Sequence, residues 1–448
     1  MKKFIETISN IWKIEELRQR ILLTLGFLLI FRLGTYVVLP GVDPEELDKA
    51  STGAQEGLLG LIDIFAGGAF SRASVFALGI MPYISASIIL QLLTMALPYF
   101  QRLQRDGESG RKKINQYTRY LTVVITAMQA TAYLSSQVVT KPGVVPGIDT
   151  MWWIQSVLVL VSGTVFVMWI GEKITDKGIG NGISLIIMIG IIARLPFAFG
   201  AELDSRYNQD NGGLIMFLVE MAVLLAVVIF CILMVQGTRR IPVHFAKRIV
   251  GNKQYGGNRN FIPLKVNAAG VMPIIFAQAI MLIPITLVGF TTDQSSWFMR
   301  EFSNNYGLTY NIVEGLLIVV FTYFYTAITI NPTMMADELK RNEGFIPGVK
   351  PGKKTAEYID QIMSRITLPG SLMLAFIAAL PAIVINFGVN NEFAQFYGGT
   401  SILILVGVVL DTLQQIESYL LMRHYDGLMK SGRIKGRSSV GMTANAAY

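Results

Sequence analysis

Residues 79–84 read Gly-Ile-Met-Pro-Tyr-Ile, and residues 270–275 read Gly-Val-Met-Pro-Ile-Ile. A second pair of segments is related in the same way, because residues 182–187 and 399–404 share the pattern Gly-x-Ser-x-x-Ile. Glycine and proline are common in membrane helices, so one such match would carry little weight. Two motifs that recur in the same order predict an internal repeat.

The chain around these motifs is too apolar for a water-soluble protein. Of its 448 residues, 52% are hydrophobic and 15% are charged, whereas soluble domains carry about 25% charged residues. The mean hydropathy is +0.50. Stretches of about 20 mostly apolar residues, the length needed to cross about 30 Å of hydrocarbon, occur at 21–40, 75–98, 118–138, 152–171, 179–199, 214–236, 268–290, 313–332, 368–388 and 399–422. Because backbone groups in lipid must be hydrogen-bonded within the segment, we expect all of them to be helices.

These spans predict an all-α polytopic membrane protein with ten transmembrane helices in two five-helix halves. Five is an odd number, so the second half must enter the membrane inverted, and such repeats place a central pathway at their interface. The predicted parts are an N-terminal tail 1–20, a first half 21–199, an outer linker 200–213, a second half 214–422 and a basic tail 423–448.

The cations of the chain are unevenly placed. The net charge is +8, and 31 of the 38 Lys and Arg residues fall in the tails and in alternate loops, which predicts that both termini are cytoplasmic. The loop 237–267 holds seven cations and no acid, and the loop 333–367 is mixed. This excess suggests docking of an anionic partner such as RNA or an acidic protein surface. Arg32, Arg72 and Arg194 lie near or within apolar segments and have no place in this scheme.

One apolar segment, residues 58–70, is too short to cross the membrane and is punctuated by glycines. Segments of this length are re-entrant or lie at the membrane surface. The re-entrant interpretation requires that the non-helical flanks line a cavity.

Isoleucine ends every copy of the two motifs, at Ile84, Ile187, Ile275 and Ile404, and Ile80 and Ile183 lie four residues earlier on two of the same predicted helices. Residues four apart share a helical face. A lone isoleucine in a membrane helix usually faces lipid or packs within the bundle, but equivalent positions in a repeat favour convergence on one axis. Because β-branched side chains are stiff, such a ring is suited to closing a pore by dewetting.

No sequence pattern supports catalysis, a cofactor or a metal site. The chain lacks a Walker A sequence, an HExxH motif and a GxSxG motif, and it has one cysteine, Cys231, and two histidines. A secondary solute carrier with inverted repeats is the main alternative, although its expected mid-membrane acids, Glu220, Glu314 and Asp411, do not match across the repeat. A membrane scaffold without a pore is the other alternative.

The order of motifs along nearly the whole chain resembles the SecY family, the channel subunits of the bacterial Sec translocon. The segments that carry the resemblance are AGGAFSRAS (66–74), GIMPYISASI (79–88), GESGRKKI (107–114), QYTRY (116–120), GIGNGIS (178–184), KVNAAGVMPIIF (265–276), Asn331-Pro332, PGVKPG (347–352) and GGTS (398–401). It implies a passive channel that passes unfolded polypeptides across the bacterial inner membrane and releases apolar segments sideways into lipid.

The resemblance also assigns residues to parts of that channel. The pore ring falls on Ile80, Ile84, Ile183, Ile187, Ile275 and Ile404. The plug, within about 58–72, is represented by Leu61, Ile62, Ile64, Phe65, Gly67, Gly68 and Arg72. The lateral gate between spans 2 and 3 and spans 7 and 8 is represented by Gln91, Thr122 and Asn267.

The same resemblance implies partners. These are the membrane subunits SecE and SecG, the ATPase motor SecA, the ribosome, secretory and membrane polypeptides, and lipid. Docking of the motor or ribosome is assigned to Arg239, Arg240, Lys247, Arg248 and Lys350. The family typically has an arginine where Lys350 stands, and lysine keeps the charge but loses the bidentate fork.

Overall fold

The computed structural model describes residues 12, 14–44, 46–47, 63, 65–140, 143–145, 149–208, 213–245, 247–250, 253–256, 259–278, 280–281 and 307–430. The chain divides into two compact units. The first comprises Met1–Thr52, Phe65–Gly190 and Val408–Tyr448, and the second comprises Gly53–Ile64 and Ile191–Gly407. The chain therefore passes from the first unit to the second inside a helix, α9 (Gly182–Asn208).

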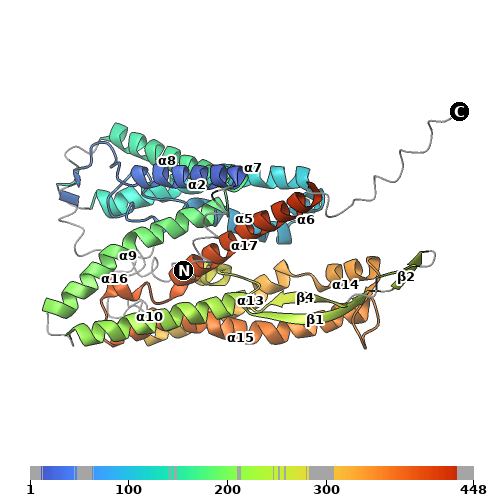
Figure 1. Cartoon of the computed structure of the whole chain (residues 1–448). Helices are drawn as coiled ribbons and strands as arrows, with labels where there is room; N and C mark the ends of the chain where they lie inside the picture. The colour runs from blue at the N-terminus through green and yellow to red at the C-terminus, as the bar shows by residue number, and fades with distance from the viewer. Residues whose placement is uncertain are drawn as a thin grey trace. The chain divides into compact units, whose positions relative to one another are not determined.

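The first unit is built from long helices. They are α2 (Glu15–Gly34), α5 (Met81–Ala96), α6 (Pro98–Arg105), α7 (Glu108–Tyr133) with a π-helical turn at Leu134–Val138, and α8 (Thr150–Lys177). Helix α2 packs against α8, and α7 packs against both α5 and α8. Figure 1 shows α2, α7 and α8 running alongside one another.

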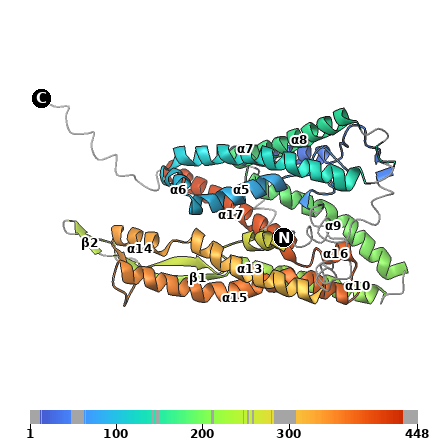
Figure 2. The same cartoon turned by 180° about the vertical axis from the view of Figure 1, so that it is seen from behind.

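The second unit combines helices with a small sheet. Its helices are α10 (Gly213–Gln236), α13 (Leu308–Thr329), α14 (Pro332–Arg341), α15 (Lys353–Asn386), α16 (Asn391–Ala394) and the start of α17 (Gly399–Lys430). Helix α15 packs against α13 and α14. Figures 1 and 2 place α14 and the strands at the same end of α15.

Six helices of the described residues are long and apolar enough to cross a membrane, and a seventh qualifies if the bent pair Met81–Thr94 and Pro98–Gln104 forms one span. The predicted count of ten stays a prediction. Helix α2 overlaps the first predicted span but is not among these six helices. Only its residues 21–31 lie between the charged residues Arg20 and Arg32. At 1.5 Å per residue this stretch covers about 17 Å, which is short of a full crossing.

The strands are a correction to the expected all-α fold. The loop 237–267 forms β1 (Thr238–Phe245), β2 (Lys247–Val250), β3 (Lys253–Gly256) and β4 (Arg259–Lys265), and β5 is Gly344–Phe345. All pairings are antiparallel, with the order β4-β1-β5 in one sheet and β2-β3 as a separate hairpin. The alternation is visible in β1, where Ile241 and Val243 are buried and Arg240 and Pro242 are exposed.

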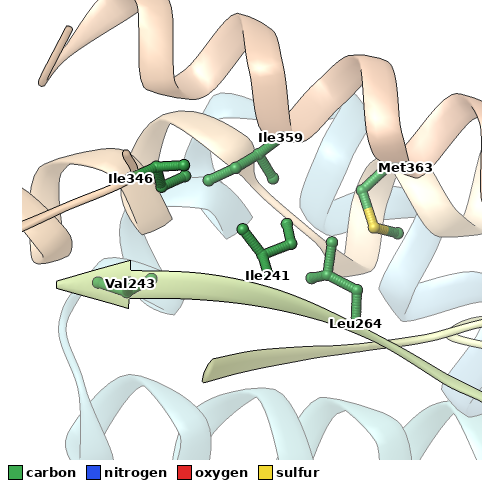
Figure 3. Close-up of a cluster of buried hydrophobic side chains, with 6 residues drawn as sticks. All are labelled: Ile241, Val243, Leu264, Ile346, Ile359 and Met363. Atoms are coloured by element: carbon green, nitrogen blue, oxygen red, sulfur yellow. The ribbon is translucent and has the colours of Figure 1, made fainter. Parts of the chain in front are cut away.

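A small apolar core holds this sheet against the helices. Figure 3 shows its members, Ile241, Val243, Leu264, Ile346, Ile359 and Met363. Each buried aliphatic side chain of this size contributes about 1.5–3 kcal/mol. The sheet of β4, β1 and β5 therefore forms a packed platform after α10 and against the first part of α15, and not a loose connection between helices.

Candidate functional site

The two copies of the Gly-x-Met-Pro motif have the same local structure. Gly79 and Gly270 both adopt positive φ angles, +53° and +64°, which a side chain would disfavour. In each copy the helix starts two residues later, at Met81 in α5 and at residue 272 in the second copy. Proline fits the first helical turn because its missing N–H needs no partner there. The internal repeat is thus present in the conformation of the backbone.

The second motif pair behaves alike, because Gly182 is the first residue of α9 and Gly399 is the first residue of α17. As a result the four motif isoleucines, Ile84, Ile187, Ile275 and Ile404, all lie five residues beyond a glycine that precedes or opens a helix. Ile80, Ile187 and Ile404 are buried, and Ile84, Ile183 and Ile275 are partly buried. Four of the six belong to the first unit, and Ile275 and Ile404 belong to the second. The ring as a whole stays a prediction.

The segment after residue 64 is fixed by hydrogen bonds to its main chain. Arg32 of α2 donates from Nη1 to the Gly67 carbonyl at 2.7 Å. The Tyr133 hydroxyl donates to the Phe70 carbonyl at 2.6 Å, with the two rings 4.7 Å apart. The guanidinium of Arg72 lies over the ring of Tyr36 at 4.5 Å. Of the predicted plug residues, Phe65, Gly67, Gly68 and Arg72 are described, whereas Leu61, Ile62 and Ile64 lie outside the described residues.

A buried acid, Asp63, belongs to the second unit. Asp63 forms an ion pair with Arg194 of α9, and the side chains are 6% and 21% exposed. Sequence reasoning left Arg194 without a role and did not single out Asp63. An arginine inside an apolar stretch was the available signal, because a charge there needs a partner.

Helix α9 also approaches this segment through a glycine. A Cβ atom on Gly190 would lie 2.6 Å from the Phe65 carbonyl oxygen and 3.3 Å from the Gly67 nitrogen. Only a residue without a side chain allows this contact between two backbones.

Gly190→Ala is therefore expected to destabilise the first unit by about 1–3 kcal/mol through overpacking. Gly200→Ala is the matched control on the same helix, since no atom lies within 4 Å of its Cβ position, and it is expected to be neutral or to stabilise by up to about 1 kcal/mol. Unfolding of both variants in detergent micelles by denaturant titration measures the difference. Equal stability of the two variants would contradict the close approach.

A buried ionic cluster lies at the other end of α9. Arg206 donates from Nε to Glu202 at 2.9 Å and from Nη2 to Glu220 at 2.5 Å and to the Gly388 carbonyl at 2.8 Å. All three charged side chains are at least 94% buried. The cluster, hereafter the Arg206 cluster, joins α9, α10 and the segment just after α15, and it places Arg206, which falls within the predicted linker 200–213, at a buried position inside a helix.

The Arg206 cluster extends to the segment before α17. The Asn390 N–H donates to Glu202 at 2.8 Å, and the Tyr397 hydroxyl donates to the Glu220 carbonyl oxygen at 2.8 Å. Phe393 packs edge-on against Tyr397 and Phe199. Two of the three acids considered for a coupled carrier have other environments. Glu220 is paired with Arg206, and Asp411 is exposed on α17.

The predicted gate residues are in different environments. Gln91 is exposed on α5. Thr122 is fully buried, and its hydroxyl donates to the Thr118 carbonyl of its own helix at 2.7 Å. Asn267 is partly buried after β4, and its side-chain oxygen has no hydrogen-bond partner among the described residues. These positions do not test the lateral gate.

The predicted docking residues lie in β1, in the separate β2-β3 hairpin and in the turn before α15. Arg239 and Arg240 are exposed at the start of β1, and Lys350 is exposed in the turn that leads to α15. Lys247 and Arg248 belong to strand β2. The base of the β1–β4 pair is closed by a hydrogen bond of 2.9 Å from the Val266 N–H to the Gly237 carbonyl. The cations of β1 are therefore presented by a defined backbone.

Comparisons with known proteins point to one family. The family model SecY matches residues 74–413. The chain is 42% identical over 436 residues to the protein translocase subunit SecY of Streptomyces scabiei, covering 94% of this chain and 99% of that protein. It is 39% identical over 454 residues to the same subunit of Chlamydia trachomatis, covering 96% and 99%.

Solved structures show the same fold. A protein-conducting channel is similar with a TM-score of 0.62 and 17% identity, covering 90% of this chain and 92% of that one. The Sec61 channel in a canine ribosome-channel complex is similar with a TM-score of 0.57 and 16% identity, covering 90% and 92%.

Proposed function

The chain belongs to the SecY family, a family of protein-conducting channels and not of enzymes, and we propose that it is the central pore of a protein-secretion translocase. In this proposal ten helices in two inverted halves surround a pore that is closed by the isoleucine ring and the plug, and that opens sideways at Gln91, Thr122 and Asn267. Unfolded polypeptides cross, and apolar segments leave into lipid. The chain is a multi-pass membrane protein, and we place it in the bacterial inner membrane with both termini in the cytoplasm.

The observation that supports the pore is the shared conformation of the repeated motifs. Gly79 and Gly270 set equivalent helix starts with positive φ, and Gly182 and Gly399 open two further helices. Equivalent starts give the isoleucines equivalent depths along their helices. A stiff apolar side chain at each position is suited to a dry constriction.

The proposed partners follow from the family and from the platform. A channel without a nucleotide-binding motif needs an external source of energy, which is the ATPase SecA or the ribosome. Related channels are seen in ribosome complexes, the canine Sec61 complex and the idle yeast Ssh1 complex. SecE and SecG complete the membrane complex. Arg239, Arg240, Lys247, Arg248 and Lys350 are the proposed docking cations.

Replacing Ile84 and Ile275 with glycine is expected to raise the resting ion leak about tenfold, because widening an apolar constriction allows it to fill with water. The measurement uses the complex with its partners in liposomes, with ion flux and translocation of a secretory polypeptide recorded together. Ile89→Gly with Ile280→Gly is the matched control, because these isoleucines lie five residues further along the same two segments and are exposed. A background leak together with lost uptake of a small solute would favour a solute carrier instead.

A further inference from the structure

The turn before helix α9, residues 178–181, is held by side chains from other helices of the first unit. Ile179 and Gly180 are buried, and buried backbone N–H groups need acceptors. The Ile179 N–H donates to the hydroxyl oxygen of Thr24 on α2 at 3.1 Å. The Gly180 N–H donates to the side-chain oxygen of Gln415 on α17 at 2.8 Å. Both acceptors come from helices that are distant in the sequence and belong to the same unit as the turn.

Thr24 is oriented for this contact by its own helix. Its hydroxyl donates to the Arg20 carbonyl at 2.8 Å, which leaves the oxygen free to accept from Ile179. Arg20 extends its guanidinium toward the Gly178 carbonyl at 3.5 Å and lies over the ring of Tyr419 on α17 at 5.3 Å. Helix α2 therefore binds the turn at two consecutive residues and also contacts α17.

Helix α17 approaches the backbone of the turn at close range. Gly180 has a φ angle of +80°, and a Cβ atom on it would lie 3.0 Å from the Thr412 hydroxyl oxygen and 3.1 Å from a methyl carbon of Leu185. A side chain at this position is disfavoured by both the backbone conformation and the space. Thr412 and Gln415 are three residues apart and share a face of α17, so one face of this helix holds the turn.

The turn in its own part sets the first residues of α9. The Gly182 N–H donates to the hydroxyl of Thr175 on α8 at 2.9 Å, and the side-chain oxygen of Asn181 caps the helix by accepting from the Ile183 N–H at 3.1 Å. Two predicted ring residues, Ile183 and Ile187, follow one and five residues after Gly182. A slip of this start by one residue would turn each side chain by about 100° and move it by about 1.5 Å.

We propose that Thr24 and Gln415 are positioning residues for the closed constriction. They hold the turn 178–181 from two separate helices, and they thereby fix the height and the rotation of Ile183 and Ile187. This inference rests on the proposed channel function and adds to it two side chains, outside the predicted ring, plug and gate, that keep the resting pore closed.

The test measures resting ion leak in liposomes that contain the complete complex. Thr24→Val and Gln415→Leu each remove one acceptor at nearly constant side-chain volume. Each is expected to raise the leak about threefold, because a buried N–H without a partner destabilises the closed arrangement. The double variant is expected to raise it about tenfold, which corresponds to about 1.4 kcal/mol in the equilibrium between closed and open states. Thr24→Ser and Gln415→Glu keep an acceptor oxygen and are expected to stay within about twofold of the wild type.

Each substitution has a matched control in the same unit. Thr164→Val is the control for Thr24→Val, because Thr164 of α8 is 1% exposed and its hydroxyl has no hydrogen-bond partner among the described residues. Gln414→Leu is the control for Gln415→Leu, because Gln414 is the neighbouring residue of α17 and is exposed. Both controls are expected to leak at the wild-type level.

Two outcomes overturn the positioning role. One is a leak from Thr24→Val with Gln415→Leu that is no higher than that of the two controls. The other is an equal leak from the variants that keep an acceptor oxygen and the variants that lack it. Translocation of a secretory polypeptide by the wild-type complex in the same liposomes separates the two proposals. Its absence would reject the channel, whereas its presence with an unchanged leak in the double variant would reject only the positioning role.

A second measurement reports on α9 itself and does not depend on the leak. Ile187→Cys in a Cys231→Ser background places a single thiol at a ring position that is 7% exposed. Adding Thr24→Val with Gln415→Leu is expected to raise the rate of labelling by a water-soluble maleimide at least about fivefold, because a displaced helix exposes the thiol. Adding Thr164→Val with Gln414→Leu is expected to leave the rate unchanged. Equal rates in the two backgrounds would show that the turn does not set the position of α9.

Discussion

Arg206→Ala is expected to destabilise the second unit by about 3–5 kcal/mol, the usual cost of removing one partner from a buried ionic cluster. The substitution leaves Glu202 and Glu220 facing each other without a cation, with exposed fractions of 0% and 4%. It also removes the hydrogen bond to the Gly388 carbonyl. Because Glu202 and Glu220 bind Asn390 and Tyr397, the segment that leads to Ile404 is expected to lose its position as well.

The measurement is unfolding of purified variants in mixed micelles by titration with denaturing detergent. Arg119→Ala is the control, because the Arg119–Glu172 pair is bidentate yet Arg119 is 52% exposed, and its loss is expected to cost less than about 1 kcal/mol. A second comparison replaces all three charges, as Arg206→Met with Glu202→Gln and Glu220→Gln. This variant is expected to regain most of the lost stability, since no buried charge is left unpaired. Equal losses from Arg206→Ala and Arg119→Ala would show that the cluster is not an anchor.

The repeated motifs were predictable because their structure is local. A glycine followed three residues later by a proline encodes a positive φ and then a helix start, and both Gly79 and Gly270 follow that rule. The membrane class and the predominantly helical fold follow from composition in the same direct way. Family membership, inferred from ordered motifs, is confirmed by the relatives.

The sheet was missed because its sequence is charged and short in apolar residues. Ile241, Val243 and Leu264 are the buried core residues from the two paired strands, with Phe245 and Ile262 partly buried beside them, and this alternation covers too few residues to stand out from a polar loop. Its stability comes from Ile359 and Met363 on α15, about 100 residues away in the sequence. Tertiary packing of this kind leaves no local signal.

The buried charges were missed for a related reason. A window of about 20 apolar residues ends α9 near residue 199, whereas the helix continues to Asn208, where Arg206 pairs with both Glu202 and Glu220. Likewise, Arg32 and Arg194 were visible as anomalies, but their partners at Gly67 and Asp63 lie far away in the sequence. Sequence showed which charges needed an explanation, and only the folded chain supplies it.

Ribosome binding is expected to depend strongly on the proposed docking cations of β1. Arg239→Glu with Arg240→Glu is expected to weaken binding of the ribosome to the complex at least about hundredfold at moderate salt, because two phosphate contacts become repulsive. The two arginines are consecutive in β1 and exposed, so they project to opposite sides of the strand. Ile241 and Val243 fix that strand on its core, which means that the cations are held in place before the partner arrives.

Binding is measured by co-sedimentation of the complex with ribosomes over a range of salt concentrations. The slope of log affinity against log salt is expected to fall by about two, one for each lost phosphate contact. Arg111→Glu with Lys112→Glu is the control for net charge, since these exposed cations on α7 lie on the same predicted side of the membrane. Arg239→Lys with Arg240→Lys keeps the charge and removes the bidentate fork. Any loss of affinity in this variant therefore measures the contribution of bidentate hydrogen bonding. If the α7 variant weakens binding as much as the β1 variant, the effect is one of total charge, and the platform has no specific role.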